Sequence, residues 1–250
     1  MKNIIILSQP RTGSNLLCEL LFSYGSFRIL NELFIRFHDI NDVPHTKSLR
    51  EHEITALIDH FKLKDRSLTS LIETLNNNPR ETSEILSQII PQYKIIKIHD
   101  FMLKDFELDF IFDDPETKFI VLERESKISQ YVSRIVADKL VKWTRVDTSD
   151  IKVHVDPDKF LKFKEESIDW YKTIETRLIN NGYNYLKLSY ESDLEHIDYD
   201  VLLPKINNWL DQNQISYHNN GYKIKHHVKQ NRSTLEHVIE NFSEIKSLIS

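Results

Sequence analysis

The sequence contains little glycine, little cysteine and no long hydrophobic run. Only four glycines occur among 250 residues, so the position of each one is informative. The single cysteine, Cys18, excludes a disulfide within the chain, which is consistent with a reducing compartment. The apolar start IIIL is four residues long, whereas a membrane span needs about 20 apolar residues. We therefore expect a cytoplasmic protein without a membrane span.

Neither sign of charge dominates the composition. The chain has 33 Lys and Arg against 38 Asp and Glu, which gives a net charge of −5. Such a balance provides no general attraction to polyanions, so we expect no nucleic-acid partner, and any anion site must be local. No repeat, low-complexity tract or Pro/Gly/Ser linker divides the chain, which favours one domain over residues 1–250. The sequence does not indicate an oligomeric state.

Short apolar runs alternate with helical patterns along the chain. The runs are continuous, which is typical of strands covered on both faces in parallel sheets; they occupy residues 4–7, 93–98, 119–122 and 183–188. Helical patterns cover residues 16–24, 128–140 and 160–178. This order predicts an α/β fold of three layers, with a central, mainly parallel sheet flanked by helices. Residues 48–90 carry helical patterns without a strand, which predicts a helical insertion or lid.

One of the four glycines follows the first predicted strand, in the stretch LSQPRTGSN. The first strand–helix loop of an open α/β sheet is the usual seat for a phosphate. Gly13 would let backbone amides turn toward an anion, and Thr12 and Ser14 would add hydroxyl donors. Arg11 supplies a full charge. A tight turn with Ser14 as a helix cap explains the same residues equally well. The loop lacks the first glycine and the lysine of a Walker A motif, which disfavours an ordinary NTPase.

The stretch SQPRTGSNLL, placed between a strand and an amphipathic helix, resembles the 5′-phosphosulfate loop of a known enzyme family. This family is the sulfotransferases that use 3′-phosphoadenosine 5′-phosphosulfate (PAPS), and the loop is closest to the bacterial trehalose-sulfotransferase type, with Pro10 inserted. The resemblance implies a P-loop-like sulfotransferase fold, PAPS as co-substrate, a small hydroxyl compound as acceptor and no metal. It also implies that residues 11–15, including Asn15, bind the nucleotide. Arg11 would in addition stabilise the leaving oxygen.

Two further stretches supply candidate bases. NELF, residues 31–34, resembles the family's Pro-x-Glu-Phe-Phe segment, whose glutamate is the proposed general base and falls on Glu32. KIIKIHDF, residues 94–101, resembles the Lys-Thr-His segment of cytosolic sulfotransferases, whose histidine base falls on His99. Apart from the resemblance, Glu32 would be a solvated loop acid and His99 a structural residue at a strand end. We predict that Glu32 is the base and keep His99 as the alternative.

A fourth stretch, IVLERESKISQYVSR, resembles the strand and helix that hold the 3′-phosphate. The family's arginine falls on Arg124 and its serine best on Ser133, although the interval is nine residues instead of the usual eight. Ser129 lies on the same helical face and is the alternative. Lys229 and Arg232 precede a predicted final helix, where many sulfotransferases close a basic segment over the 3′-phosphate.

A fifth stretch, LKLSYESDLEHI, resembles the family's Tyr-Glu-Asp-Leu segment, and we expect its Tyr190 and Glu191 to brace the loops. Two other classes of protein share such a sheet and anion loop. A nucleotide or sugar kinase would need carboxylates for magnesium and a lysine in the loop. A catalytically idle nucleotide-binding protein would keep Arg11 and Arg124 without either base. The mixed polar composition of residues 48–90 favours a polar acceptor such as a sugar.

Overall fold

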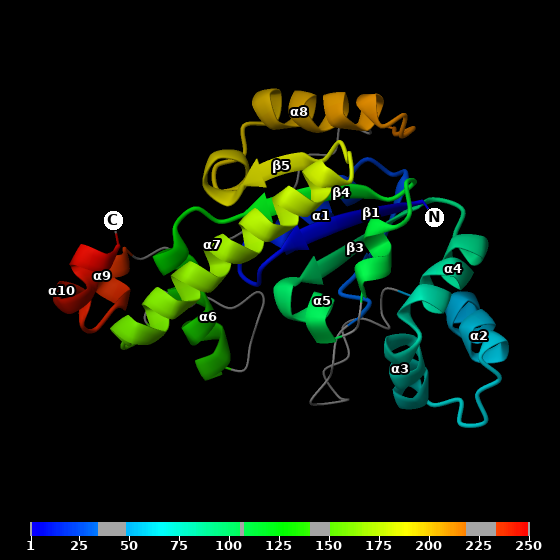
Figure 1. The fold of residues 1–250 in the computed structure, drawn as a ribbon, viewed down its shortest axis with the longest axis horizontal. Helices are drawn as coiled ribbons and strands as arrows, with labels where there is room; N and C mark the ends of the chain where they lie inside the picture. The colour runs from blue at the N-terminus through cyan, green and yellow to red at the C-terminus, as the bar shows by residue number, and fades with distance from the viewer. Residues whose placement is uncertain (1, 35–48, 106–107, 141–150, 219–233, 250) are drawn as a thin grey trace.

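A computed structural model of the chain describes residues 2–34, 49–105, 108–140, 151–218 and 234–249 (Figure 1). Its centre is a five-stranded sheet in which every strand pairs with its neighbours in parallel, in the order β2–β3–β1–β4–β5. The strands are β1 Asn3–Ser8, β2 Phe27–Asn31, β3 Tyr93–His99, β4 Lys118–Glu123 and β5 Leu186–Ser189. The predicted α/β fold with a parallel central sheet flanked by helices is confirmed.

The three central strands are those whose apolar runs predicted them. β1 is buried at all six positions, and β3 and β4 are buried at nearly all of theirs, because helices cover both faces of the sheet. β2 was not among the predicted runs, since only two of its five residues are buried and it carries Arg28. β5 begins at Leu186, three residues later than its apolar run.

Helices form a layer on each face of the sheet. One face packs against α1 (Ser14–Phe22) and α8 (Tyr199–Gln212) through an apolar cluster that includes alternate residues of β1 and β4. The other face packs against α7 (Pro157–Asn180), which crosses the strands diagonally in Figure 1. α5 (Asp100–Asp105) and the short helix η3 (Leu108–Phe112) follow β3 on this second face.

The predicted helical insertion consists of α2 (Glu51–His60), α3 (Leu68–Asn77) and α4 (Pro79–Ile89). Their buried leucines and isoleucines join the cluster on the second face of the sheet. An ion pair of 3.0 Å between Arg28 of β2 and the buried Glu53 of α2 fastens the insertion to the sheet edge. Whether these helices act as a lid over an acceptor stays a prediction.

A third apolar cluster joins α6 (Lys127–Leu140) and the start of α7 to the C-terminal segment. The predicted single final helix is wrong, because the segment forms two short helices, α9 (Leu235–Val238) and α10 (Phe242–Ile245), followed by η5 (Lys246–Leu248). Between them Ile239 is extended and bridges to Val153. The amide of Asn241 binds both the backbone N–H and the carbonyl of Val155, and these contacts interrupt the helix.

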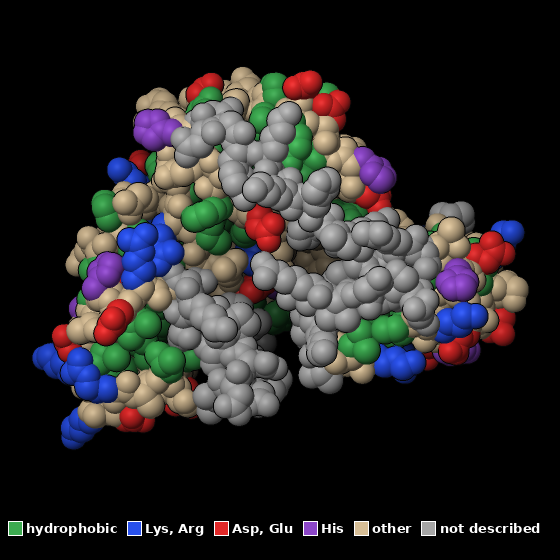
Figure 2. Space-filling model, turned by 180° about the vertical axis from the view of Figure 1, so that it is seen from behind, with side chains coloured by type: hydrophobic (Ala, Val, Ile, Leu, Met, Phe, Trp, Pro, Cys, Tyr) green, Lys and Arg blue, Asp and Glu red, His purple; other side chains and the backbone are tan. Residues whose placement is uncertain are grey.

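No described helix has the length and the apolar character that a membrane crossing requires. The described part of the face in Figure 2 carries Lys, Arg, Asp and Glu side chains interspersed with one another.

The ion pair between β2 and α2 generates a stability prediction. Glu53 also accepts a hydrogen bond of 2.6 Å from the backbone N–H of Arg50, so Glu53→Ala removes both this hydrogen bond and the ion pair with Arg28. We expect a loss of about 1–3 kcal/mol in the free energy of unfolding, measured by urea denaturation. Glu51→Ala, on the exposed side of the same helix, is the control and should change it by less than about 0.5 kcal/mol. Equal losses in both variants would contradict the anchoring role.

Candidate functional site

The strand order creates a crevice at the carboxyl ends of β1 and β4. The chain leaves β1 toward β2 on one side and leaves β4 toward β5 on the other, so the two loops diverge. Ligands of open α/β sheets bind at such a switch point. The predicted anion loop follows β1 here, and Arg124 follows β4.

The loop between β1 and α1 has two residues in the left-handed region, Arg11 with φ 69° and Gly13 with φ 85°. The ring of Tyr190 lies against Gly13, and a Cβ on Gly13 would sit 2.6 Å from it. Glycine is therefore required by backbone angle and by space. The hydroxyl of Thr12 is buried and donates to the carbonyl of Gln9 at 2.9 Å, so it braces the loop. Ser14 begins α1, whose first amides have no partner within the helix.

The start of the loop is fixed by Gln9, which is 3% exposed. Its side-chain amide donates to Asp100 at 3.0 Å and accepts from Ser167 of α7 at 2.6 Å. Its backbone N–H donates to the hydroxyl of Tyr171, which in turn donates to the carbonyl of Leu122. All these groups are satisfied internally, so the loop enters the site in one conformation.

Arg11 and Arg124 meet beside this loop, together with the N-terminal half of α6. The Nε of Arg11 donates to the hydroxyl of Ser133 at 2.9 Å, and Arg124 donates from Nη1 to the carbonyl of Arg11 at 3.1 Å. Burial, with a smaller contribution from the Arg124 guanidinium, lowers the pKa of Arg11 to about 10. Burial lowers the pKa of Arg124 as well. We call Arg11, Arg124 and Ser133 the arginine cluster.

Tyr190 and Glu191 hold Arg124 in this place. The Arg124 guanidinium lies 4.7 Å from the centre of the Tyr190 ring, and its Nε is 3.6 Å from a carboxylate oxygen of Glu191. Glu191 also accepts hydrogen bonds from the backbone N–H groups of Glu125 and Ser126 at 2.8 and 3.1 Å, just before α6 begins. The expected bracing role of Tyr190 and Glu191 agrees with these contacts.

The serines of α6 lie on one side of the helix, as their spacing indicates. The hydroxyl of Ser126 donates to that of Ser129 at 2.7 Å and accepts from its backbone N–H at 3.4 Å, so Ser126 caps the helix. Ser133 contacts Arg11 directly, whereas the hydroxyl of Ser129 contacts Ser126. The geometry thus favours Ser133 over Ser129 as a partner of the arginines.

Glu32 and His99, the two candidate bases, lie next to each other on the β2–β3 side of the crevice. The Nε2 of His99 is 3.4 Å from Oε1 of Glu32, and the ammonium of Lys97 is 2.5 Å from the same oxygen. Lys97 also donates a hydrogen bond to the side chain of Asn15 in the first turn of α1, so Asn15 lies beside these three residues. We call Glu32, Lys97 and His99 the acid–base cluster.

The contacts assign different properties to the two candidate bases. Burial alone would raise the pKa of Glu32, but the Lys97 ammonium and the His99 imidazole outweigh it and hold that pKa far below its ordinary value. The Nδ1 of His99 lies 3.0 Å from the carbonyl oxygen of Ser8, which can only accept, so the neutral ring carries its proton there. The Nε2 lone pair is then available for a proton. The geometry therefore disfavours the predicted base, Glu32, and favours His99.

Two residues of the site, Lys97 and Gln9, were not predicted to have a role. Lys97, like Lys94, is a charged residue within the apolar run of β3, and this was the only signal for it in the sequence. Gln9 lies within a recognised stretch but was not assigned to the site. Lys229 and Arg232 lie outside the described residues, so their predicted role is untested. Within the described ranges, no group of three His, Cys, Asp or Glu residues is arranged to hold a metal ion.

Comparison with known proteins assigns no family to this arrangement: no family model and no curated protein matches the chain.

The contact between Gly13 and Tyr190 generates a second prediction. Gly182 is a matched control, because its φ is 73° but no atom lies within 4 Å of the place where a Cβ would stand. Gly182→Ala should therefore cost only the backbone term, about 1–2 kcal/mol. Gly13→Ala adds the clash with Tyr190 and should cost at least about 1 kcal/mol more, as measured by urea denaturation. Equal costs would show that the ring does not press on the loop.

Proposed function

We propose that the protein is a sulfotransferase that transfers the sulfuryl group of PAPS to a hydroxyl of a small polar acceptor, such as a carbohydrate, in the cytoplasm. The observation that carries this proposal is the pairing of two clusters at one crevice. The arginine cluster lies on the β4 side of the loop after β1, and the acid–base cluster lies on the β2–β3 side. Cations for a charged donor and a base for a hydroxyl thus flank one anion loop.

The arginine cluster suits the 3′-phosphate of the nucleotide. The Arg124 guanidinium lies close enough to Arg11 to lower its pKa, and an anion bound between two such cations would stabilise both. Ser133 adds a hydroxyl, and the first amides of α1 offer donors for the 5′-phosphate. Arg11 contacts Ser133 and Arg124, the residues proposed to bind the 3′-phosphate, so we assign Arg11 mainly to nucleotide binding. The role predicted for it at the leaving oxygen stays a prediction.

The acid–base cluster suits activation of the acceptor hydroxyl. In the proposed step the acceptor oxygen forms a bond to sulfur, and the bond between sulfur and the 5′-phosphate oxygen breaks. The leaving adenosine 3′,5′-bisphosphate takes the electron pair, and the acceptor proton goes to Nε2 of His99. The Glu32 carboxylate, 3.4 Å away, stabilises the imidazolium that forms. Lys97 lies beside both groups and keeps Glu32 ionised.

A sugar or nucleotide kinase remains the alternative, because it would use the same sheet and anion loop. Two observations favour sulfuryl transfer over it. The loop carries no lysine, and the carboxylate of Glu32 is held by Lys97. A catalytically idle nucleotide-binding protein would need the arginine cluster but not the acid–base cluster. Transfer of labelled sulfate from PAPS to a panel of sugars, phenols and lipids, run beside magnesium-dependent ATP turnover, separates these three functions.

The arginine cluster predicts which nucleotide the protein prefers. Adenosine 3′,5′-bisphosphate at a hundredfold excess over its Kd should stabilise the fold by about 2.7 kcal/mol, or raise Tm by about 5–10 °C, and ATP should do so much less. Arg124→Ala should abolish this difference. Arg134→Ala, an exposed arginine on α6, should preserve it. Equal shifts by the two nucleotides would remove the 3′-phosphate site from the proposal.

The acid–base cluster predicts which residue accepts the proton. His99→Asn should lower kcat about 100-fold or more with bisphosphate binding retained, whereas Glu32→Gln should cost about tenfold. Because the pKa of Glu32 lies far below its ordinary value, Glu32 stays ionised above pH 5 and cannot cause a change of kcat/KM with pH in that range. Any fall of kcat/KM on acidification above pH 5 should therefore persist in Glu32→Gln, while the larger loss of kcat should occur in His99→Asn. The reverse pattern would restore Glu32 as the base.

A further inference from the structure

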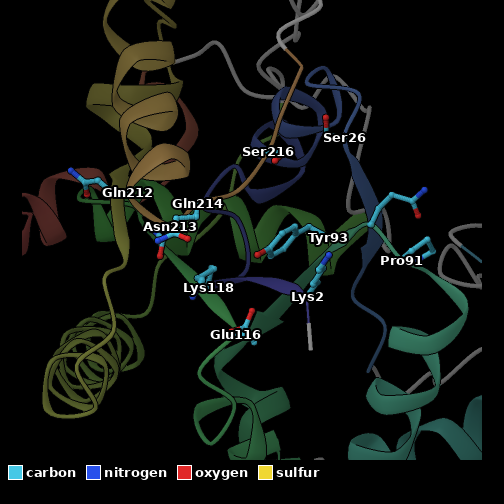
Figure 3. Close-up of a pocket in the computed structure, with 11 residues that line it drawn as sticks. Lys2, Ser26, Pro91, Tyr93, Glu116, Lys118, Gln212, Asn213, Gln214 and Ser216 are labelled. Atoms are coloured by element: carbon cyan, nitrogen blue, oxygen red, sulfur yellow. The ribbon is translucent and has the colours of Figure 1, made fainter.

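A polar groove lies at the amino ends of the strands, at the opposite end of the sheet from the anion loop. It consists of two hollows of about 600 and 480 Å³, which share Lys118 and Asn213. The first hollow is drawn in Figure 3, where Lys2, Tyr93, Lys118 and Gln214 surround it from four separate segments of the chain. We call the two hollows the amino-end groove. Volumes of this size are typical of sites for small ligands.

Several polar groups of the groove have unused hydrogen-bonding capacity. The side chains of Lys2, Gln92, Tyr93 and Gln214 make no hydrogen bond to another described residue. The site at the carboxyl ends differs, because Gln9 there satisfies both ends of its amide within the protein. Lys2, Gln92 and Gln214 are exposed, so these groups can exchange bound water for the polar groups of a ligand.

The unpaired charges of the groove have an excess of one positive charge, because Asp113 of the second hollow is paired with Arg80 at 3.0 Å. Lys2 and Lys118 line the first hollow together with one acid, Glu116, and neither ammonium is paired with a carboxylate of the described residues. Lys118 donates only to the carbonyl of Pro115, at 3.1 Å. The chain as a whole is acidic, with a net charge of −5, so this pair is a local attraction for an anion. Lys118 borders both hollows, which places the charge at their junction.

The rest of the lining matches hydroxyl-rich rings. Each amide side chain offers a donor and an acceptor side by side, which fits neighbouring hydroxyls of a sugar. Six amides line the two hollows: Gln92, Asn181, Asn184, Gln212, Asn213 and Gln214. Tyr93 and Tyr183 add half-buried aromatic rings, one in each hollow, as surfaces for the apolar side of a sugar ring.

We propose that the amino-end groove binds an acidic oligosaccharide, with sugar rings in both hollows and a sulfate or carboxylate substituent at Lys118. The proposal rests on the groove itself and does not depend on sulfotransferase activity. The groove lies about 20 Å from the anion loop, the length of a six-residue strand.

Binding is tested by titrating the full chain with four probes, followed by two-dimensional amide NMR. The probes are a monosulfated disaccharide, a disaccharide with one carboxylate, the corresponding neutral disaccharide and inorganic sulfate. We expect at least one acidic disaccharide to bind about 10–100-fold more tightly than the neutral one and than sulfate alone. The shifted amides should lie in residues 92–93, 112–114, 116–118, 181–184 and 212–216, which border the two hollows. Equal binding of the neutral disaccharide or of sulfate overturns the proposal, as do shifts confined to other residues.

Variants of Lys118 test the charge at the junction. Lys118→Met keeps the apolar stem and should weaken the acidic disaccharide about tenfold or more, whereas Lys118→Arg should retain most of the affinity. Lys162→Met removes an ammonium on α7 that is 76% exposed and does not line the groove, so it should leave binding unchanged. An unchanged affinity in Lys118→Met, or equal losses in Lys118→Met and Lys162→Met, overturns the proposal. Unchanged NMR spectra outside the groove confirm that the variants fold.

Discussion

The candidate site depends on the buried ammonium of Lys97. Its side chain is 1% exposed, within the sheet, and it contacts Glu32 at the end of β2 and Asn15 in the first turn of α1. An unpaired charge at such depth would cost several kcal/mol, so the fold is stable only with these partners in place. The ammonium of Lys97 thereby fixes the carboxyl ends of β2 and β3 relative to the amino end of α1.

The same ammonium separates the roles of Glu32 and His99. Lys97 keeps Glu32 ionised at every pH at which the protein is expected to function, and a carboxylate with so low a pKa is a weak base. His99 is oriented by the carbonyl of Ser8, so its Nε2 faces the carboxylate. A proton bound at Nε2 would form a hydrogen bond to the Glu32 carboxylate, which already carries its negative charge. In the proposed reaction the pair would therefore work as one unit, in which His99 accepts the proton and Glu32 supplies the compensating charge.

The sequence predicted the parts of this protein that follow from local pattern. Continuous apolar runs identified β1, β3 and β4, and the helical pattern over residues 160–178 identified α7. It did not predict β2, whose mixed burial gives no clear pattern, or the break at Asn241, whose cause is a contact with a distant segment. Nor did it predict Lys97, since only the packing of α1 on the sheet shows that this lysine is buried.

Charge balance explains why this crevice needs two arginines. Glu191 orders the start of α6 by accepting from two backbone amides, but it also lies 3.6 Å from Arg124 and cancels part of its charge. With one arginine the crevice would be close to neutral and would attract an anion only weakly. Arg11 restores the excess of positive charge. Its backbone carbonyl also accepts a hydrogen bond from Arg124, so the backbone of Arg11 positions the Arg124 guanidinium. The left-handed backbone at Arg11 is the local cost of this placement, and the contacts of both guanidiniums offset it.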